Sequence, residues 1–175
     1  MRAAIQLIPA WAPNLHPMIV HFPIVLVMVA ALADLIHVVR PGMRGPGVLA
    51  PSLYVLGALA SVSAYVSGRV AAATVFIPGM AHGLVDEHGN WALATMISFV
   101  VLATLRPAGR LVGLADTRTT RLVFLVLGLA VLVLVQQTAE RGARLVYEQG
   151  VGVVTGPGSM DSDALDSAGV EGNSR

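Results

Sequence analysis

The stretch Leu15-His16-Pro17-Met18-Ile19-Val20-His21-Phe22-Pro23 opens an apolar segment that continues to about Val39. That segment is long enough to cross a bilayer, since a membrane-spanning helix needs ~20 residues that each rise ~1.5 Å. Ionisable side chains at the mouth of such a helix are costly unless they face protein or water. The histidines of this stretch are therefore the first candidates for a functional role.

The composition places the whole chain in the membrane class. Of its 175 residues, 55% are hydrophobic and 12% are charged, with a mean hydropathy of +0.75, whereas soluble domains carry about 25% charged residues. The net charge of +1 and the scattered arginines give no basic patch for nucleic acid. Cysteine is absent from the sequence, which excludes disulfides, thiolate metal sites, iron–sulfur clusters and thioether-attached haem.

Four apolar segments predict membrane-spanning helices at about residues 17–39, 49–68, 88–105 and 120–137. Pro23 should kink the first helix by freeing the carbonyl of Ile19, and Arg106-Pro107 should end the third. The sequence thus predicts an all-α bundle of four transmembrane helices with up-and-down topology and both termini on the same side.

Three parts of the chain are expected. Residues 1–14 form an N-terminal lead that lacks the features of a signal peptide. Residues 15–154 form the membrane domain, in which residues 140–154, after the fourth span, are expected to form an ordered amphipathic segment. Residues 155–175 are rich in Gly, Ser and Asp, have little to bury, and are expected to be disordered.

Small residues recur at helical spacing along the second span, where they are Gly57, Ala60, Ser61, Ala64 and Gly68. Small residues four apart let helices approach closely in lipid. Tight helix packing is the expected role of this face, and room for a flat cofactor is the alternative.

Histidines gather at one membrane face. Because alternate spans begin on the same side, His16, His21, His82 and His88 share that face, and His37 lies at the other, ~24 Å along the helix from His21. Imidazole is the commonest neutral metal ligand and binds haem iron axially. His21 and His88 lie at compatible depths, so we predict that they ligate one haem iron, with His16 and His82 as further cofactor-binding groups.

Two alternatives to a haem stay open for these histidines. Each could be an interfacial side chain that hydrogen-bonds at a helix end. Three or four of them could instead bind Zn, Cu, Fe or Ni together with a neighbouring carboxylate.

At the opposite face, Asp34 and His37 lie three residues apart on one side of the first span. They could relay protons or contact a quinone, or Asp34 could pair locally or with Arg40. Tyr54 is expected to anchor the interface. The sequence contains no nucleophile elbow, phosphate loop or paired carboxylates, so no catalytic residue is predicted.

The arginines favour one orientation. The two turns on the side of His37 hold more of them than the opposite side, which also carries Asp86, Glu87 and Glu140. Positive charge favours the cytoplasm, so both termini and the histidine cluster are expected outside. The arginines of the two turns are Arg40, Arg44, Arg106, Arg110, Arg118 and Arg121.

The run 16–24, His-Pro-Met-Ile-Val-His-Phe-Pro-Ile, resembles the His-Pro-x-x-Val-His-Phe-Pro-Ile signature of the bacterial membrane family called domain of unknown function 2231. Asp86-Glu87-His88 is similar to that family's histidine before its third helix, and residues 144–153 resemble its Leu-Val-Tyr-x-x-Gly-Val-Gly-Val ending. The resemblance implies a four-helix membrane domain and, through the likeness of its layout to b-type cytochromes, haem binding.

These patterns lead to one functional prediction. The chain is expected to be a multi-pass protein of the bacterial inner membrane, a subunit that transfers electrons through haem b near the outer face rather than a stand-alone enzyme. Its expected partners are lipids, a membrane quinone, and a redox protein or larger complex. The alternative is a non-redox subunit, metal-binding or structural, that anchors a partner complex.

Overall fold

The computed structural model describes residues 14–153, apart from the side chain of Arg110, and this part of the chain is helical without strands. Four of its helices are long and apolar enough to cross a membrane, which confirms the predicted fold class. The predictions for the lead and the tail fall largely on residues 1–13 and 154–175, outside the described part. The helices are α1 (His16–Ile19), α2 (His21–Val39), α3 (Arg44–Thr74), η1 (Gly79–Ala81), α4 (His82–Leu111) and α5 (Arg118–Tyr147).

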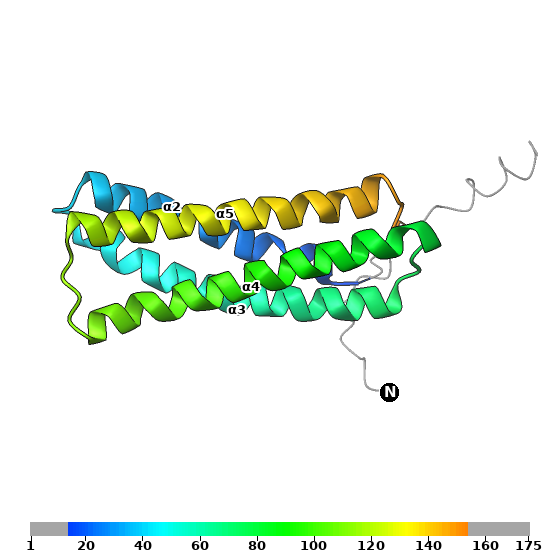
Figure 1. Cartoon of the computed structure of the whole chain (residues 1–175), viewed down its shortest axis with the longest axis horizontal. Helices are drawn as coiled ribbons and strands as arrows, with labels where there is room; N and C mark the ends of the chain where they lie inside the picture. Colours follow the sequence, from blue (N-terminus) through cyan, green and yellow to red (C-terminus); the bar gives the residue numbers. More distant parts are fainter. Residues whose placement is uncertain (1–13, 154–175) are drawn as a thin grey trace, which may run out of the picture.

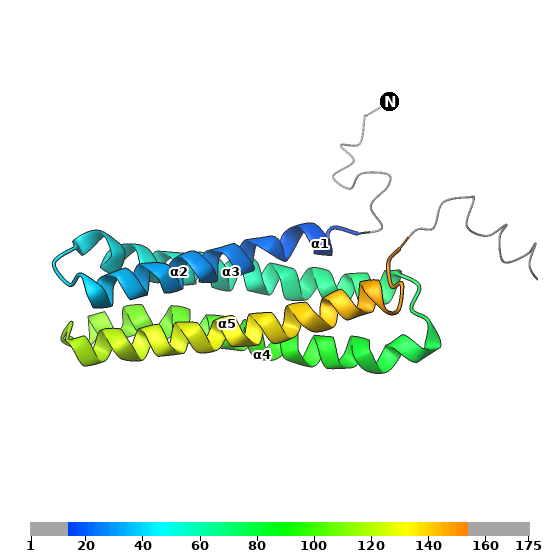
Figure 2. The same ribbon diagram turned by 90° about the horizontal axis from the view of Figure 1, so that it is seen from above.

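The four long helices form an up-and-down bundle (Figure 1). Successive helices run antiparallel, α2 packs on α3 and α5, and α4 packs on the same two helices. Seen from above, α2 and α3 form one layer and α4 and α5 the other (Figure 2). The start of α1 and the end of α5 lie together at what we call the histidine end, which contains His16 and His88. The α2–α3 and α4–α5 connections lie at the arginine end, which contains Arg106 and Arg121.

Pro23 interrupts the helical hydrogen bonding of the first span, as predicted. Its missing N–H leaves the carbonyl of Ile19 without the usual helical donor, and α1 ends at Ile19 while α2 begins at His21. Beyond the break, one face of α2 is buried at intervals of three and four residues. These buried residues are Pro23, Val27, Ala30, Asp34 and His37.

Two predicted helix ends were wrong. Pro107 does not end the third span, because α4 continues to Leu111; a proline near the end of a helix removes one hydrogen bond, and the helix continues past it by one turn. The fourth helix does not end near residue 137, because α5 runs without interruption to Tyr147 and includes the first part of the amphipathic segment. Gly150 then terminates it with φ +63°, a conformation that glycine adopts without strain.

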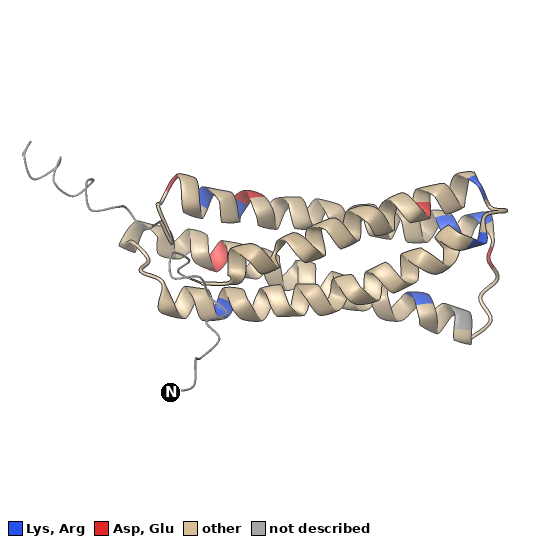
Figure 3. Ribbon diagram, turned by 180° about the vertical axis from the view of Figure 1, so that it is seen from behind, with Lys and Arg blue, Asp and Glu red and all other residues tan. Residues whose placement is uncertain are grey.

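Apolar residues fill the middle of the bundle. Phe99 of α4 lies against Gly57 of α3, where an added Cβ would come within 2.7 Å of the ring. Gly57, Ser61 and Ala64 are buried, which confirms close packing along the small-residue face of α3. Charged residues lie toward the two ends of the bundle (Figure 3). Among the described residues, the charged groups thus gather at the histidine end and the arginine end.

Candidate functional site

His16 of α1 and His88 of α4 face each other at the histidine end. Their ring centroids are 6.4 Å apart and the ring planes are inclined by 82°. The Nδ1 atom of His16 lies 3.1 Å from the carbonyl oxygen of Ala64, and that of His88 lies 3.0 Å from the carbonyl oxygen of Thr138. A carbonyl oxygen only accepts, so in its neutral form each ring donates from Nδ1 and has its lone pair on Nε2. This is the tautomer in which a histidine binds metal through Nε2.

Glycines and hydroxyl groups position the two rings. A Cβ added at Gly68 would lie 2.9 Å from Cε1 of His16, and one added at Gly142 would lie 3.1 Å from Cε1 of His88. The hydroxyl of Ser67 is a further partner of His16 Nδ1, at 3.1 Å. Both rings therefore lie in spaces that α3 and α5 leave only because these positions lack side chains.

His21 and His82 do not join this pair. Both side chains are exposed. His21 is two residues before the buried Pro23, about 200° away around a helix, and so it faces outward. The 3.6-residue period of the first span is the signal that could have separated the two histidines, because His16 lies seven residues before Pro23, on the same face. The structure brings together His16 and His88, and the ligand roles of all four histidines stay predictions.

The predicted alternative of a site built from three or four metal-binding side chains finds no counterpart. Across residues 14–153, no group of three or more His, Cys, Asp or Glu side chains is arranged to hold a metal ion. Glu87 instead accepts a hydrogen bond of 2.7 Å from Nε of Arg141. The Arg141 guanidinium also lies 4.5 Å from the centroid of the Trp91 ring. Through these two contacts, Arg141 of α5 packs against α4 beside His88.

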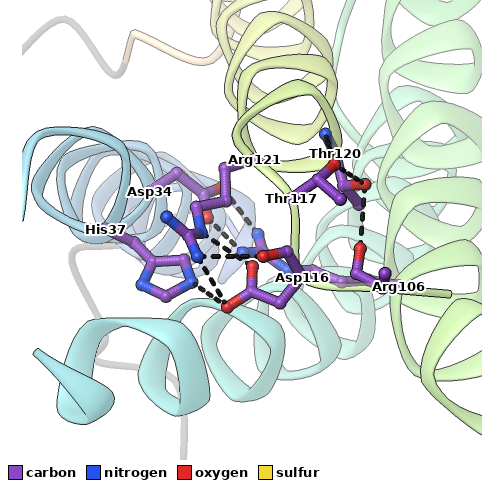
Figure 4. A network of polar contacts seen from close by, with 8 residues as sticks. Asp34, His37, Arg106, Asp116, Thr117, Thr120 and Arg121 are labelled. Atoms are coloured by element: carbon purple, nitrogen blue, oxygen red, sulfur yellow. Dashed lines mark hydrogen bonds and ion pairs between the residues drawn. The ribbon is translucent and has the colours of Figure 1, made fainter. Parts of the chain in front are cut away.

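At the arginine end, Asp34 forms a buried ion pair with Arg106 (Figure 4). Nη1 of Arg106 donates to Oδ2 of Asp34 at 2.7 Å, and Nη2 contacts Oδ1. The hydroxyl of Tyr54 donates to the same Oδ2 at 3.1 Å. All three residues are buried: Asp34 is 2% exposed, Arg106 is 6% exposed and Tyr54 is 0% exposed. Phe124 covers the Arg106 guanidinium, with its ring centroid 5.0 Å away.

This cluster corrects two predictions. The partner of Asp34 is neither a local residue nor Arg40; it is Arg106, 72 residues along the chain, because the extended α4 carries Arg106 into the bundle. Tyr54 is not an interface anchor, because it is fully buried and its hydroxyl is used by the Asp34 carboxylate.

His37 belongs to a second cluster at this end. Its Nε2 lies 3.3 Å from Oδ2 of Asp116, in the loop before α5. Arg121 donates to the same carboxylate from Nε at 2.7 Å and from Nη2 at 3.1 Å. The Arg121 guanidinium holds the pKa of Asp116 below its usual range, and His37 contributes less. Asp34 and His37 therefore have different partners, so the structure does not join them in the predicted relay.

Asp116 is the residue that sequence analysis missed. The available signal was a single carboxylate in an arginine-rich turn, five residues before Arg121. A cavity of about 210 Å³ opens beside its carboxylate. The residues that line it are His37, Arg106, Gly109, Leu114, Ala115, Asp116, Thr120, Arg121 and Phe124.

Comparisons with known proteins identify a family for most of the chain. A family model described as a predicted membrane protein, DUF2231, matches residues 12–155. No curated protein and no solved structure matches the chain, so the likeness to b-type cytochromes stays a prediction. The match covers most of the sequence and the whole of the four-helix bundle, and the chain belongs to the DUF2231 family of predicted membrane proteins.

Proposed function

We propose that the chain is a membrane-embedded electron-transfer subunit of the b-type cytochrome kind, in which His16 and His88 hold a haem iron. One observation carries the proposal. Two imidazoles on opposite sides of one metal ion have centroids about 6 Å apart, given metal–nitrogen bonds of ~2.0 Å and a ring radius of ~1.1 Å. The rings of His16 and His88 are 6.4 Å apart.

The number of available ligands favours haem over a bare metal ion. Structural and catalytic zinc sites use three or four protein ligands, whereas a haem iron already has four porphyrin nitrogens and takes two axial histidines. The described residues offer a pair of imidazoles and no larger group of metal-binding side chains. When bound, a haem would supply one-electron exchange.

The surrounding residues would orient the two ligands. The carbonyl oxygens of Ala64 and Thr138 fix the tautomer and the ring orientation, and such outer contacts raise the basicity of a metal-bound histidine. Gly68 and Gly142 leave the rings the space that they occupy. The proposal keeps His88 from the predicted pair and replaces His21 with His16, because His21 is exposed on the outside of the bundle.

The position of the pair limits where electrons could be exchanged. His37, at the arginine end, follows His16 by 21 residues, which is about 32 Å along a helix. Electron transfer slows steeply with distance. A quinone or redox protein that exchanges electrons with this site would therefore have to approach the histidine end.

Visible absorption of the purified chain, made with ample haem supply, tests the proposal. We expect sharp α and β bands after reduction, loss of haem in His16→Ala and His88→Ala, and retention in His21→Ala, His82→Ala and His37→Ala. Circular dichroism checks that each variant is folded. In addition, imidazole should restore haem binding to His16→Gly by replacing the missing ring.

Three results would contradict the proposal. Retention of the low-spin spectrum in His16→Ala with loss in His21→Ala would return the ligand role to His21. A colourless wild-type protein with a stoichiometric metal ion would favour the non-redox metal-binding alternative. A colourless protein without metal would favour a structural subunit.

A further inference from the structure

We propose that the arginine end contains a binding site for the phosphate headgroup of an anionic membrane lipid, and that the carboxylate of Asp116 occupies this site when no lipid is bound. The proposal is independent of any metal chemistry at the histidine end. It rests on a difference in solvent exposure: Asp116 is much more exposed than the groups that bind its carboxylate.

The binding groups are partly or largely buried and belong to helices, whereas the carboxylate that they bind is exposed and belongs to the loop before α5. The side chains of His37 on α2 and Arg121 on α5 are 9% and 15% exposed, and that of Asp116 is 61% exposed. Arg121 holds both carboxylate oxygens in a fork, with bonds of 2.7 and 3.1 Å. A phosphodiester offers two unesterified oxygens to the same fork, and arginine binds phosphate and carboxylate by this geometry.

The neighbouring cavity has room for such a headgroup. It measures about 210 Å³ and lies between the end of α4 and the start of α5, at the end of the membrane spans. Phe124 and Leu114 supply apolar wall, while His37 and Arg121 supply polar wall. An amphiphile with its phosphate at Arg121 and its glycerol backbone against Leu114 and Phe124 matches this division.

The charge of this end also favours an anion. Its helix ends and turns carry more arginines than carboxylates, and the only carboxylates among their described residues are Asp34 and Asp116. Asp34 is already matched by Arg106. Basic pockets between membrane helices bind anionic lipid headgroups at the cytoplasmic side. The arginines are Arg40, Arg44, Arg106, Arg110, Arg118 and Arg121.

A titration of the full chain in neutral detergent tests the proposal. The probes are short-chain phosphatidylglycerol, phosphatidylcholine with the same acyl chains, and inorganic phosphate, and binding is measured by the shift in melting temperature. We expect phosphatidylglycerol to bind more tightly than either of the other probes. Asp116→Asn removes the competing carboxylate and should tighten binding about five-fold, because an exposed ion pair contributes about 1 kcal/mol.

Matched variants separate this site from general attraction between charges. Glu148→Gln makes the same change in net charge at the histidine end and should leave binding unchanged. Arg121→Gln should weaken binding about ten-fold, whereas Arg118→Gln, which removes an arginine outside the cavity lining, should have little effect. Arg121→Lys keeps the charge but not the fork, and should bind with intermediate affinity.

Two results would overturn the proposal. Equal affinity for phosphatidylglycerol in the Asp116→Asn, Glu148→Gln and wild-type proteins would show that Asp116 does not compete for the site. Equal affinity for inorganic phosphate and phosphatidylglycerol would remove the assignment to a lipid. If Arg121→Gln does not fold, the comparison of Arg121→Lys with Arg118→Gln decides the outcome.

Discussion

The two ends of the bundle solve the problem of burying polar groups in different ways. At the arginine end, opposite charges meet: Asp34 contacts Arg106 through both oxygens and also accepts from Tyr54. At the histidine end, uncharged rings donate to main-chain carbonyls, as His16 does to Ala64 and His88 to Thr138. The first arrangement satisfies its buried charges within the chain, whereas the second leaves two Nε2 lone pairs that can bind a metal.

This difference suggests a division of roles between the ends. A buried ion pair fixes the relative position of helices more than it adds stability, and the Asp34–Arg106 pair joins α2 to α4. The histidine pair brings α1 and α4 together through ring proximity, and under the proposed function a haem iron would lie between the two rings. We expect substitutions at the arginine end to affect folding first, and substitutions at His16 or His88 to affect cofactor binding first.

The largest effect should follow when one member of the buried ion pair is removed. Arg106→Leu leaves the Asp34 carboxylate buried without its counter-charge, which should lower the free energy of unfolding by about 3–5 kcal/mol. The double variant Asp34→Leu/Arg106→Leu removes both charges and should recover most of this loss. Unfolding in detergent measures both. Additive losses in the double variant would contradict the pairing.

A smaller loss should follow when a methyl group is added beneath Tyr54. A Cβ at position 128 would come within 2.1 Å of the Tyr54 hydroxyl oxygen. Gly128→Ala should therefore displace the hydroxyl from Asp34 and cost about 1–3 kcal/mol. Because Tyr54→Phe removes the contacting atom, Gly128→Ala should cost less in a Tyr54→Phe background. An equal cost in both backgrounds would place the clash elsewhere.

Removal of the exposed ion pair at the histidine end should lower the free energy of unfolding by less. The Glu87 side chain is 49% exposed and that of its partner Arg141 is 16% exposed, so solvent screens their attraction. Glu87→Gln should cost no more than about 1 kcal/mol, and haem binding should persist. Unfolding and visible absorption measure the two effects. A cost near that of Arg106→Leu would remove the contrast between the two ends.

The smallest expected effect is the change in stability at acidic pH. Arg121 lowers the pKa of Asp116 in the folded protein, so the stabilisation by Asp116 is present above the ordinary carboxylate pKa of about 3.9 and is lost as the pH falls below it. The difference in melting temperature between wild type and Asp116→Asn should be constant from about pH 7 to 5 and shrink below about pH 4. Solvent exposure limits this contribution to about 1 kcal/mol. A difference that stayed constant down to about pH 3 would contradict this contribution of the Asp116 carboxylate.

Local features of the sequence predicted the bundle well, because they act within one helix. Apolar length predicted the spans, Pro23 predicted the freed carbonyl of Ile19, and the small residues of 57–68 predicted the close approach of α3. Partner choice was harder to predict, because it depends on packing between distant segments. In the sequence, Arg106 stands next to Pro107 at the predicted end of the third span. Its pairing with Asp34 depends on the continuation of α4 past this position.

The histidine site shows the same limit. The predicted depth in the membrane favoured His21, because His21 lies further into the first span than His16 and nearer the level expected for His88. Depth alone does not say which way a side chain faces. The phase of the buried face, counted back from Asp34 through Pro23, places His16 inward and His21 outward.

Electron paramagnetic resonance of the oxidised wild-type protein tests the central claim most directly. Axial imidazoles with nearly perpendicular planes give a low-spin ferric signal of strong anisotropy, whereas nearly parallel planes give an ordinary rhombic one. The 82° between the His16 and His88 rings predicts the strongly anisotropic signal, and its loss in His16→Ala. A rhombic signal, a high-spin signal or the absence of any haem signal would contradict the account.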